Sequence, residues 1–128
     1  MYHYIPPVPS FFHHSIFSLE IKDSTIHNAG LGVYTLDAIP NGTFIDYYIG
    51  LKCRYPMSSY FIETGETSGI DAGSYPRCYM AMLNDSYQSQ YKVNCEFRIK
   101  DGIVSVYAIR DILPNEELFV SYGDEYWY

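Results

Sequence analysis

Hydrophobic residues in this chain recur in short runs, and many of the runs alternate with polar residues or are rich in β-branched and aromatic side chains. Such runs are typical of strands that are buried on one face. They predict strands over 19–25, 33–39, 43–49, 60–63, 93–98, 103–109 and 118–122. Strong turn signals separate them, among them Pro40-Asn41-Gly42. Many short strands with little helix predict a compact, mainly β fold.

The clearest local signal is a hairpin. It joins residues 93–98 to 103–109 across Lys100-Asp101-Gly102, because Asp-Gly is a favoured pair in two-residue hairpin turns. Residues 78–83 are the best candidate for a short helix, although apolar runs of this length also suit a strand. The glycine-rich stretch 65–73 predicts a loop or hairpin around Ile70-Asp71-Ala72.

Length and charge narrow the class of protein. A chain of 128 residues predicts one domain. We expect an N-terminal extension over 1–18, where three prolines favour an extended arm, and a domain over 19–128. The net charge of −7 disfavours direct nucleic-acid binding, which needs clustered Lys and Arg, and it suits a basic protein partner. No run is long and apolar enough to predict a membrane span.

The three cysteines, Cys53, Cys78 and Cys95, stand singly. A dispersed, odd number predicts reduced thiols and an intracellular setting. No Cys or His pair has the spacing of a zinc site, so we expect no metal. Small buried hydrophobic side chains are the expected role of all three.

Four segments carry candidate chemistry. The first, Gly30-Leu31-Gly32-Val33-Tyr34, continues to Tyr48-Ile49-Gly50, and its paired glycines allow a close backbone approach to a ligand. The second runs from Ile70-Asp71-Ala72 to Met80-Ala81-Met82-Leu83-Asn84-Asp85-Ser86. The third is Val93-Asn94-Cys95. The fourth joins Ala108-Ile109-Arg110-Asp111-Ile112 to Glu116-Glu117-Leu118 and Ser121-Tyr122-Gly123. Each segment alone also fits an ordinary turn or hairpin.

Taken in this order, the four segments resemble the SET domain of protein-lysine methyltransferases, most closely the minimal stand-alone SET proteins of large DNA viruses. The resemblance covers roughly residues 19–128. It implies a β-clip-like fold of several small sheets with a short helix and a C-terminal pseudoknot. It also implies S-adenosylmethionine as the methyl donor and the side-chain amine of a protein lysine as the acceptor, with a histone tail as the first substrate to consider.

The resemblance also assigns roles to residues. Tyr122 falls on the catalytic tyrosine, and a core tyrosine is the alternative interpretation. Tyr48 and Tyr126 are candidates for the lysine channel, with Tyr126 at a position that tunes the number of methyl groups added. The implied cofactor-binding residues are Gly30, Leu31, Gly32, Val33, Asn84, Asp85 and Trp127. Asn94 corresponds to an asparagine that ties the cofactor loop to the C-terminal strand.

Two departures from the family pattern leave other interpretations open. Ala81 stands where the family has Arg, and Asp85 stands where it has His. A catalytically inactive SET-like module that binds a peptide by strand addition is therefore the runner-up. A small β-rich structural or virion protein is the third interpretation. The sequence leaves open a homodimer and, for a viral protein, a location in the host nucleus or the virion.

Overall fold

The computed structural model describes residues 10–123, which form short strands and one short 3-10 helix, η1. The elements in chain order are β1 (Phe11–Phe12), β2 (Leu19–Asp23), β3 (Leu31–Thr35), β4 (Phe44–Tyr48), β5 (Leu51–Cys53), β6 (Phe61–Gly65), β7 (Ser68–Asp71), β8 (Arg77–Cys78), η1 (Tyr79–Met82), β9 (Asn84–Asp85), β10 (Cys95–Lys100), β11 (Ile103–Ala108) and β12 (Phe119–Val120). Within this part of the chain, no helix has the length and apolar character needed to cross a membrane.

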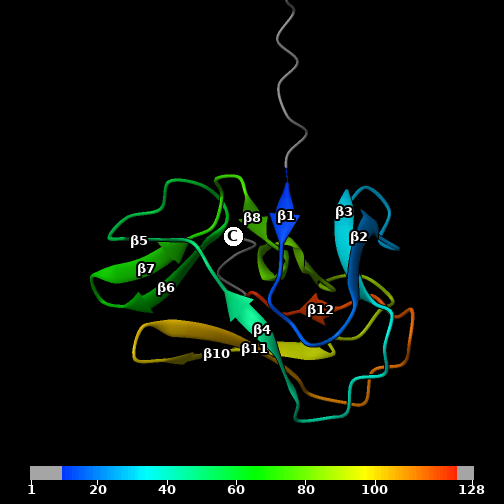
Figure 1. The fold of residues 1–128 in the computed structure, drawn as a ribbon. Helices are drawn as coiled ribbons and strands as arrows, with labels where there is room; N and C mark the ends of the chain where they lie inside the picture. Colours follow the sequence, from blue (N-terminus) through cyan, green and yellow to red (C-terminus); the bar gives the residue numbers. More distant parts are fainter. Residues whose placement is uncertain (1–9, 124–128) are drawn as a thin grey trace, which may run out of the picture.

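The strands form five small sheets in the described residues. Two have three antiparallel strands, in the orders β10–β11–β4 and β5–β7–β6. β2 pairs antiparallel with β3, and two pairs, β1–β8 and β9–β12, are parallel. Figure 1 shows β5–β7–β6 on one side of the molecule and β2–β3 on the other, with β12 between them. The predicted mainly β fold of several small sheets is confirmed.

The predicted hairpin is present, with β10 and β11 paired from Cys95–Ala108 to Lys100–Ile103. Asp101 and Gly102 both have positive φ, 52° and 77°, as a type I′ turn requires. The predicted helix is also present as η1, one turn of 3-10 helix. The glycine-rich stretch contains a regular strand, β7, which pairs on both sides.

The second predicted strand is shorter than expected. β3 ends at Thr35, and Ile39 forms only an isolated bridge with Ile112. The Thr35 hydroxyl donates to the Asp37 carbonyl at 2.7 Å, and the Asp37 amide is 3.1 Å from the same hydroxyl oxygen. These local hydrogen bonds turn the chain out of the ladder, as threonine hydroxyls commonly do.

The core is aliphatic and lies between the small sheets. In β11, Val104, Val106 and Ala108 are buried in alternation with more exposed residues, so one face of the strand packs inward. The largest side chains that are almost fully buried include Ile39, Ile45, Met80, Ile112 and Leu118. Burying such side chains is the main stabilising contribution in a domain of this size.

The C-terminal segment 116–120 crosses the centre of the molecule. Its Leu118 amide donates to the Val33 carbonyl at 2.8 Å, while β12 pairs with β9. Asn94 binds the same segment, because its amide group donates to the Glu117 carbonyl at 2.8 Å and accepts from the Phe119 amide at 2.7 Å. The segment is thus bonded to three parts of the chain that lie far apart in the sequence, as the predicted pseudoknot requires.

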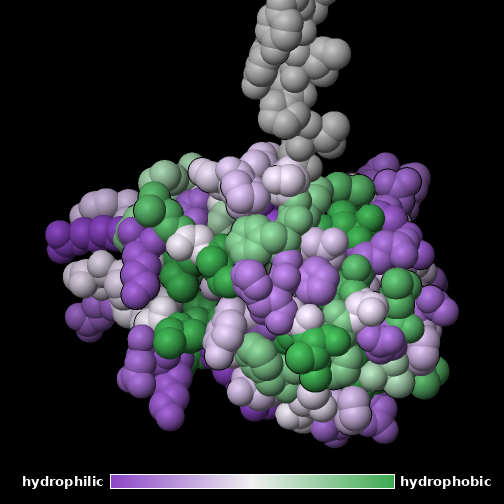
Figure 2. Space-filling view, in the orientation of Figure 1, coloured by the Kyte–Doolittle hydropathy of each residue, from purple (hydrophilic) through white to green (hydrophobic). Residues whose placement is uncertain are grey.

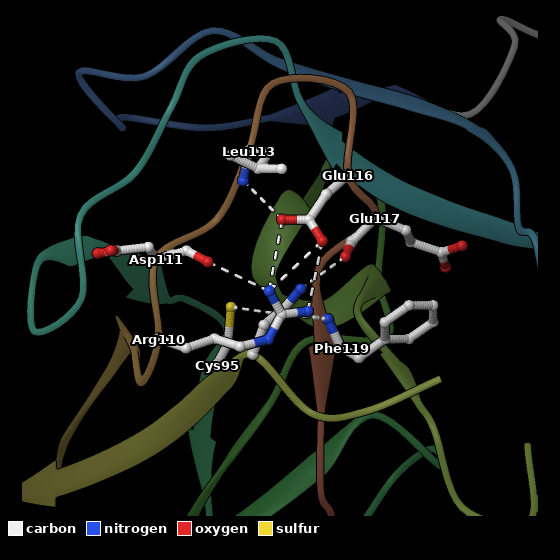
Figure 3. A network of polar contacts seen from close by, with 8 residues as sticks. Cys95, Arg110, Asp111, Leu113, Glu116, Glu117 and Phe119 are labelled. Atoms are coloured by element: carbon white, nitrogen blue, oxygen red, sulfur yellow. Dashed lines mark hydrogen bonds and ion pairs between the residues drawn. The ribbon is translucent and has the colours of Figure 1, made fainter. Parts of the chain in front are cut away.

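The turn before this crossing is fixed by Arg110 and Glu116. Figure 3 shows the Arg110 guanidinium next to the Glu116 carboxylate, 3.4 Å away, and donating to the Asp111 carbonyl at 3.1 Å. Glu116 also accepts from the Leu113 amide. These contacts close the 110–116 turn and direct the following residues into the centre of the fold.

Candidate functional site

A pocket of about 450 Å³ lies where several segments meet. Its lining residues come from the start of the glycine segment, the loops before β6 and β8, β8 itself, η1 with the chain after it, and the chain just after β12. They are Ala29, Gly30, Leu31, Ser59, Tyr60, Tyr75, Arg77, Ala81, Met82, Leu83, Asn84, Asp85 and Tyr122. The pocket therefore brings together five residues predicted from the sequence, namely Gly30, Leu31, Asn84, Asp85 and Tyr122.

The glycine segment contributes to the pocket through its first two residues only. Gly30 has a φ of +75°, which favours glycine, and its carbonyl accepts from the Ser24 amide at 2.8 Å. Gly32 and Val33 are buried and do not line the pocket. A Cβ on Gly32 would lie 2.3 Å from Glu117 Oε2, so the close approach at Gly32 is to another part of the protein.

Glu117 packs against the glycine segment and bonds the loop before it, a role that was not predicted from the sequence. It is 4 % exposed. It accepts hydrogen bonds from the Ser24 hydroxyl at 2.8 Å, the Thr25 amide at 2.8 Å and the Thr25 hydroxyl at 2.7 Å. Asn84 Nδ2 lies 3.2 Å from Glu117 Oε2. A carboxylate from the C-terminal segment thus fixes both the loop before the glycine segment and the asparagine at the pocket wall.

Asn84 and Asp85 form β9 and reach the pocket from there. Asn84 Nδ2 donates to the Leu31 carbonyl at 2.9 Å, and no donor among residues 10–123 bonds to its Oδ1. Asp85 accepts from the Tyr122 amide at 2.9 Å and from the Tyr87 amide at 2.8 Å. The two side chains therefore hold the glycine segment and the chain around Tyr122 against the same pocket.

Tyr122 is half-buried at the pocket wall. Its hydroxyl donates to the Leu83 carbonyl at 2.9 Å, and its ring packs against Phe97 with the centroids 5.4 Å apart. The hydrogen bond and the ring contact together fix the position of the Tyr122 hydroxyl relative to the pocket backbone. A functional polar group needs such fixed geometry.

Tyr48 is buried outside this pocket and next to it. Its hydroxyl donates to the carbonyl of the pocket residue Tyr60 at 2.7 Å, and its ring meets Phe97 edge to face at 5.8 Å. Tyr48 lines a second, shallower groove of about 300 Å³ with Tyr47, Ile49, Ile70 and residues 102–104. Figure 2 shows hydrophobic surface in this region, between the β5–β7–β6 sheet and the β10–β11 hairpin.

Asp71, from the Ile70-Asp71-Ala72 motif, fixes the wall that carries Ser59 and Tyr60. It accepts from the amides of Met57 and Ser58, both at 2.8 Å, and from the Gly73 amide at 3.0 Å. Burial favours the neutral acid, but these hydrogen bonds together lower the pKa of Asp71 below its usual value. The motif therefore has a structural role at the pocket edge.

Arg77, Tyr60 and Tyr75 were not predicted as site residues. Arg77 is buried in the pocket wall, and its guanidinium packs on the rings of the two tyrosines. Nothing in its local sequence distinguishes it from a surface arginine. The predicted residues Tyr126 and Trp127 lie outside the described residues.

Comparisons with known proteins identify the family of this chain. The family model described as "SET domain" matches residues 30–123, from the glycine segment to the residue after Tyr122. The chain is also 27% identical over 115 residues to a protein of Schizosaccharomyces pombe named "Histone-lysine N-methyltransferase, H3 lysine-37 specific", covering 86% of this chain and 76% of that protein. Since the family model spans most of the chain, the chain belongs to the SET domain family.

Proposed function

We propose that this protein transfers a methyl group from S-adenosylmethionine to the side-chain amine of a lysine in a basic protein. The observation that carries the proposal is the convergence of Gly30–Leu31, Asn84–Asp85 and Tyr122 on one pocket. These segments are distant in sequence and are bonded to one another through Glu117 and Asp85. A core tyrosine with no role in chemistry would not need such an arrangement.

The pocket suits a ligand of this class. Its volume of about 450 Å³ lies within the usual range of small-molecule and cofactor sites. Its wall combines apolar side chains such as Ala81 and Leu83 with the side chains of Arg77 and Asp85. It also includes Oδ1 of Asn84, an acceptor that no donor within 10–123 uses. Gly30, Leu31 and Asn84 would hold the cofactor.

When bound, S-adenosylmethionine would supply a methyl group on a positively charged sulfur, with the bond from that sulfur to the methyl carbon broken and S-adenosylhomocysteine as the leaving group. The residues of the chain would prepare the acceptor. A free lysine amine has a pKa near ~10.4 and must be neutral to attack. Loss of water on burial, as expected among the packed side chains of Tyr48, Phe97 and Tyr122, disfavours the ammonium form and lowers that pKa. The Tyr122 oxygen can stabilise positive charge at the transfer site. Alignment of the reacting atoms by the site increases the rate further.

The substrate is proposed from charge and from the relative. The net charge of −7 favours a basic partner, because opposite charges speed encounter. The S. pombe relative is named for a lysine of histone H3. Histone H3 is therefore the first substrate to test, and the groove that Tyr48 lines is the proposed approach for the substrate chain.

The test is incubation of the protein with methyl-labelled S-adenosylmethionine and, separately, histone H3, the other core histones and an acidic control protein. We expect label on lysine of a histone and none on the control, with the position read by mass spectrometry. Label on arginine or on nucleic acid, or no label on any substrate, would contradict the proposal.

An inactive SET-like peptide-binding module is the second candidate, because Ala81 and Asp85 depart from the family pattern. Such a module would bind a histone peptide by adding a strand to a sheet edge and would transfer no methyl group. Calorimetry with the peptide, run beside the labelling assay, separates the two. Peptide binding without any methyl transfer would favour the module.

A further inference from the structure

Arg77 is a buried cation without a carboxylate partner among the residues that the structure describes. The residue is 8 % exposed, and none of the ion pairs found in residues 10–123 includes it. Its Nη2 donates to the Gly73 carbonyl, and its Nη1 is 3.7 Å from the Met82 sulfur, which is a weak acceptor. Its Nε has no hydrogen-bond partner in the described part of the chain.

Aromatic rings hold this guanidinium in place. Its central carbon lies 3.9 Å from the centroid of the Tyr60 ring and 4.3 Å from that of Tyr75. Such contacts attract a cation, but they supply no counter-charge and no acceptor for its in-plane N–H groups. A buried charge is costly unless it is paired, so this site is electrostatically incomplete without an anion.

The pocket shows where an anion would come from. Arg77, Tyr60 and Tyr75 all line the pocket that also holds Asn84 and Tyr122. Among its described lining residues, the only charged side chains are Arg77 and Asp85, and the Asp85 carboxylate is bonded to the backbone of Tyr122 and Tyr87. A ligand that carries both a carboxylate and a positive group would complement these two charges, with its carboxylate facing Arg77 and its positive group on the side of Asp85.

We propose that Arg77 receives the α-carboxylate of the amino-acid part of S-adenosylmethionine. This inference rests on the proposed function and adds a specificity-determining residue to it. It also accounts for Ala81, which lines the same pocket and stands where the resembled motif has arginine. The positive charge missing at position 81 is supplied from β8, and the planar guanidinium suits a carboxylate better than a lysine would.

The test compares two ligands that differ only in this carboxylate, S-adenosylhomocysteine and its decarboxylated analogue. Calorimetry on the full chain should give the wild type at least about tenfold higher affinity for S-adenosylhomocysteine. Arg77→Met should lose that preference while its affinity for the decarboxylated analogue stays within about twofold. Arg98→Met is the matched control, because Arg98 also packs on a tyrosine ring, Tyr107 at 3.9 Å, and lies outside the pocket. It should keep the wild-type preference.

If Arg77→Met does not fold, Arg77→Lys keeps the charge without the planar fork and should show a reduced preference. Equal affinity of the wild type for the two ligands would overturn the assignment of Arg77 and leave the proposed function standing. A preference that survives unchanged in a folded Arg77→Met or Arg77→Lys would overturn it as well. No binding of either ligand by the wild type would overturn the proposed function, and this inference with it.

Discussion

Asn84 and Asn94 both hydrogen-bond the C-terminal segment, and their surroundings separate a structural asparagine from one available to a ligand. Asn94 is fully buried, and its amide group bonds the Glu117 carbonyl, the Phe119 amide and the Cys95 thiol. Asn84 is half-buried at the pocket wall. It donates to Leu31 and Glu117, and its Oδ1 has no donor among residues 10–123.

The comparison shows that residue type alone does not assign a role. Both asparagines were singled out in the sequence, and both lie within short turn-like segments. Asn94 uses both polar atoms of its side chain in hydrogen bonds within the protein, which makes it part of the fold. Asn84 keeps an acceptor that no donor among residues 10–123 uses, which makes it a candidate for binding. The two should therefore respond differently to the same substitution.

The largest effect on stability is expected for Asn94→Ala. The change leaves the Glu117 carbonyl and the Phe119 amide buried without partners, and each unsatisfied group costs ~1–3 kcal/mol. We expect the free energy of unfolding to fall by about 3 kcal/mol, measured by urea denaturation. Asn41→Ala is the control, because Asn41 is exposed and its side chain has no hydrogen bond in the described residues. An equal loss in both variants would contradict the structural role of Asn94.

Asn84→Ala should act on ligand binding more than on stability. Its affinity for S-adenosylhomocysteine should fall by ~1–3 kcal/mol, the usual cost of losing a hydrogen bond to a charged group. Its loss of unfolding free energy should be smaller than that of Asn94→Ala, because Asn84 is only half-buried. Calorimetry and urea denaturation measure the two effects. Unchanged affinity would remove Asn84 from the proposed binding site.

The contribution of Asp71 to the free energy of unfolding should depend on pH. Its pKa is lowered in the folded protein, so it stabilises the fold above its unfolded pKa of ~3.9, and this stabilisation is lost as the pH falls through the folded pKa. We expect Asp71→Asn to be less stable than the wild type by ~1–2 kcal/mol at neutral pH, with the difference narrowing below about pH 4. A difference that is constant down to pH 2 would contradict the assigned role.

The smallest expected effect is on thiol reactivity beside Asn94. Burial raises the pKa of Cys95 to about 12, although nearby Arg110 acts in the opposite direction. Burial also raises the pKa of Cys78. Since the thiolate is the reactive form, iodoacetamide should label half-buried Cys53 first in the native protein. In Asn94→Ala, mass spectrometry should find faster labelling of Cys95, and rapid labelling of Cys95 in the wild type would contradict its burial.

Local sequence signals predicted much of this fold. The Asp101-Gly102 turn and the β-branched runs fixed the β10–β11 hairpin and β4, because those preferences act between neighbouring residues. The two-residue strands β1, β8 and β9 were missed, whereas β12 lies within the predicted strand over 118–122. Each missed strand forms only through pairing with a distant segment, as when Phe11 pairs with Arg77, and no local periodicity signals such pairing.

The site residues also fall into those that the sequence identified and those that only the tertiary structure reveals. The resemblance singled out Gly30, Leu31, Asn84, Asp85 and Tyr122, which the fold brings to one pocket. Arg77 could not be identified, because only its tertiary position between Tyr60 and Tyr75 distinguishes it from an arginine on the surface. Glu117 belonged to a recognised motif, yet its role depends on the distant partners Ser24 and Thr25. A viral origin, a homodimer and a cellular location remain predictions of the sequence.

The most direct test of the proposed chemistry is the rate of methyl transfer by Tyr122→Phe. The substitution removes one hydroxyl and its hydrogen bond to Leu83, so we expect a stability loss of only ~1 kcal/mol and nearly unchanged affinity for S-adenosylhomocysteine. If that oxygen stabilises charge at the transfer site, kcat for a histone substrate should fall on the order of 10²–10³. Equal rates for the wild type and a folded Tyr122→Phe would contradict the assignment of Tyr122 as the catalytic residue.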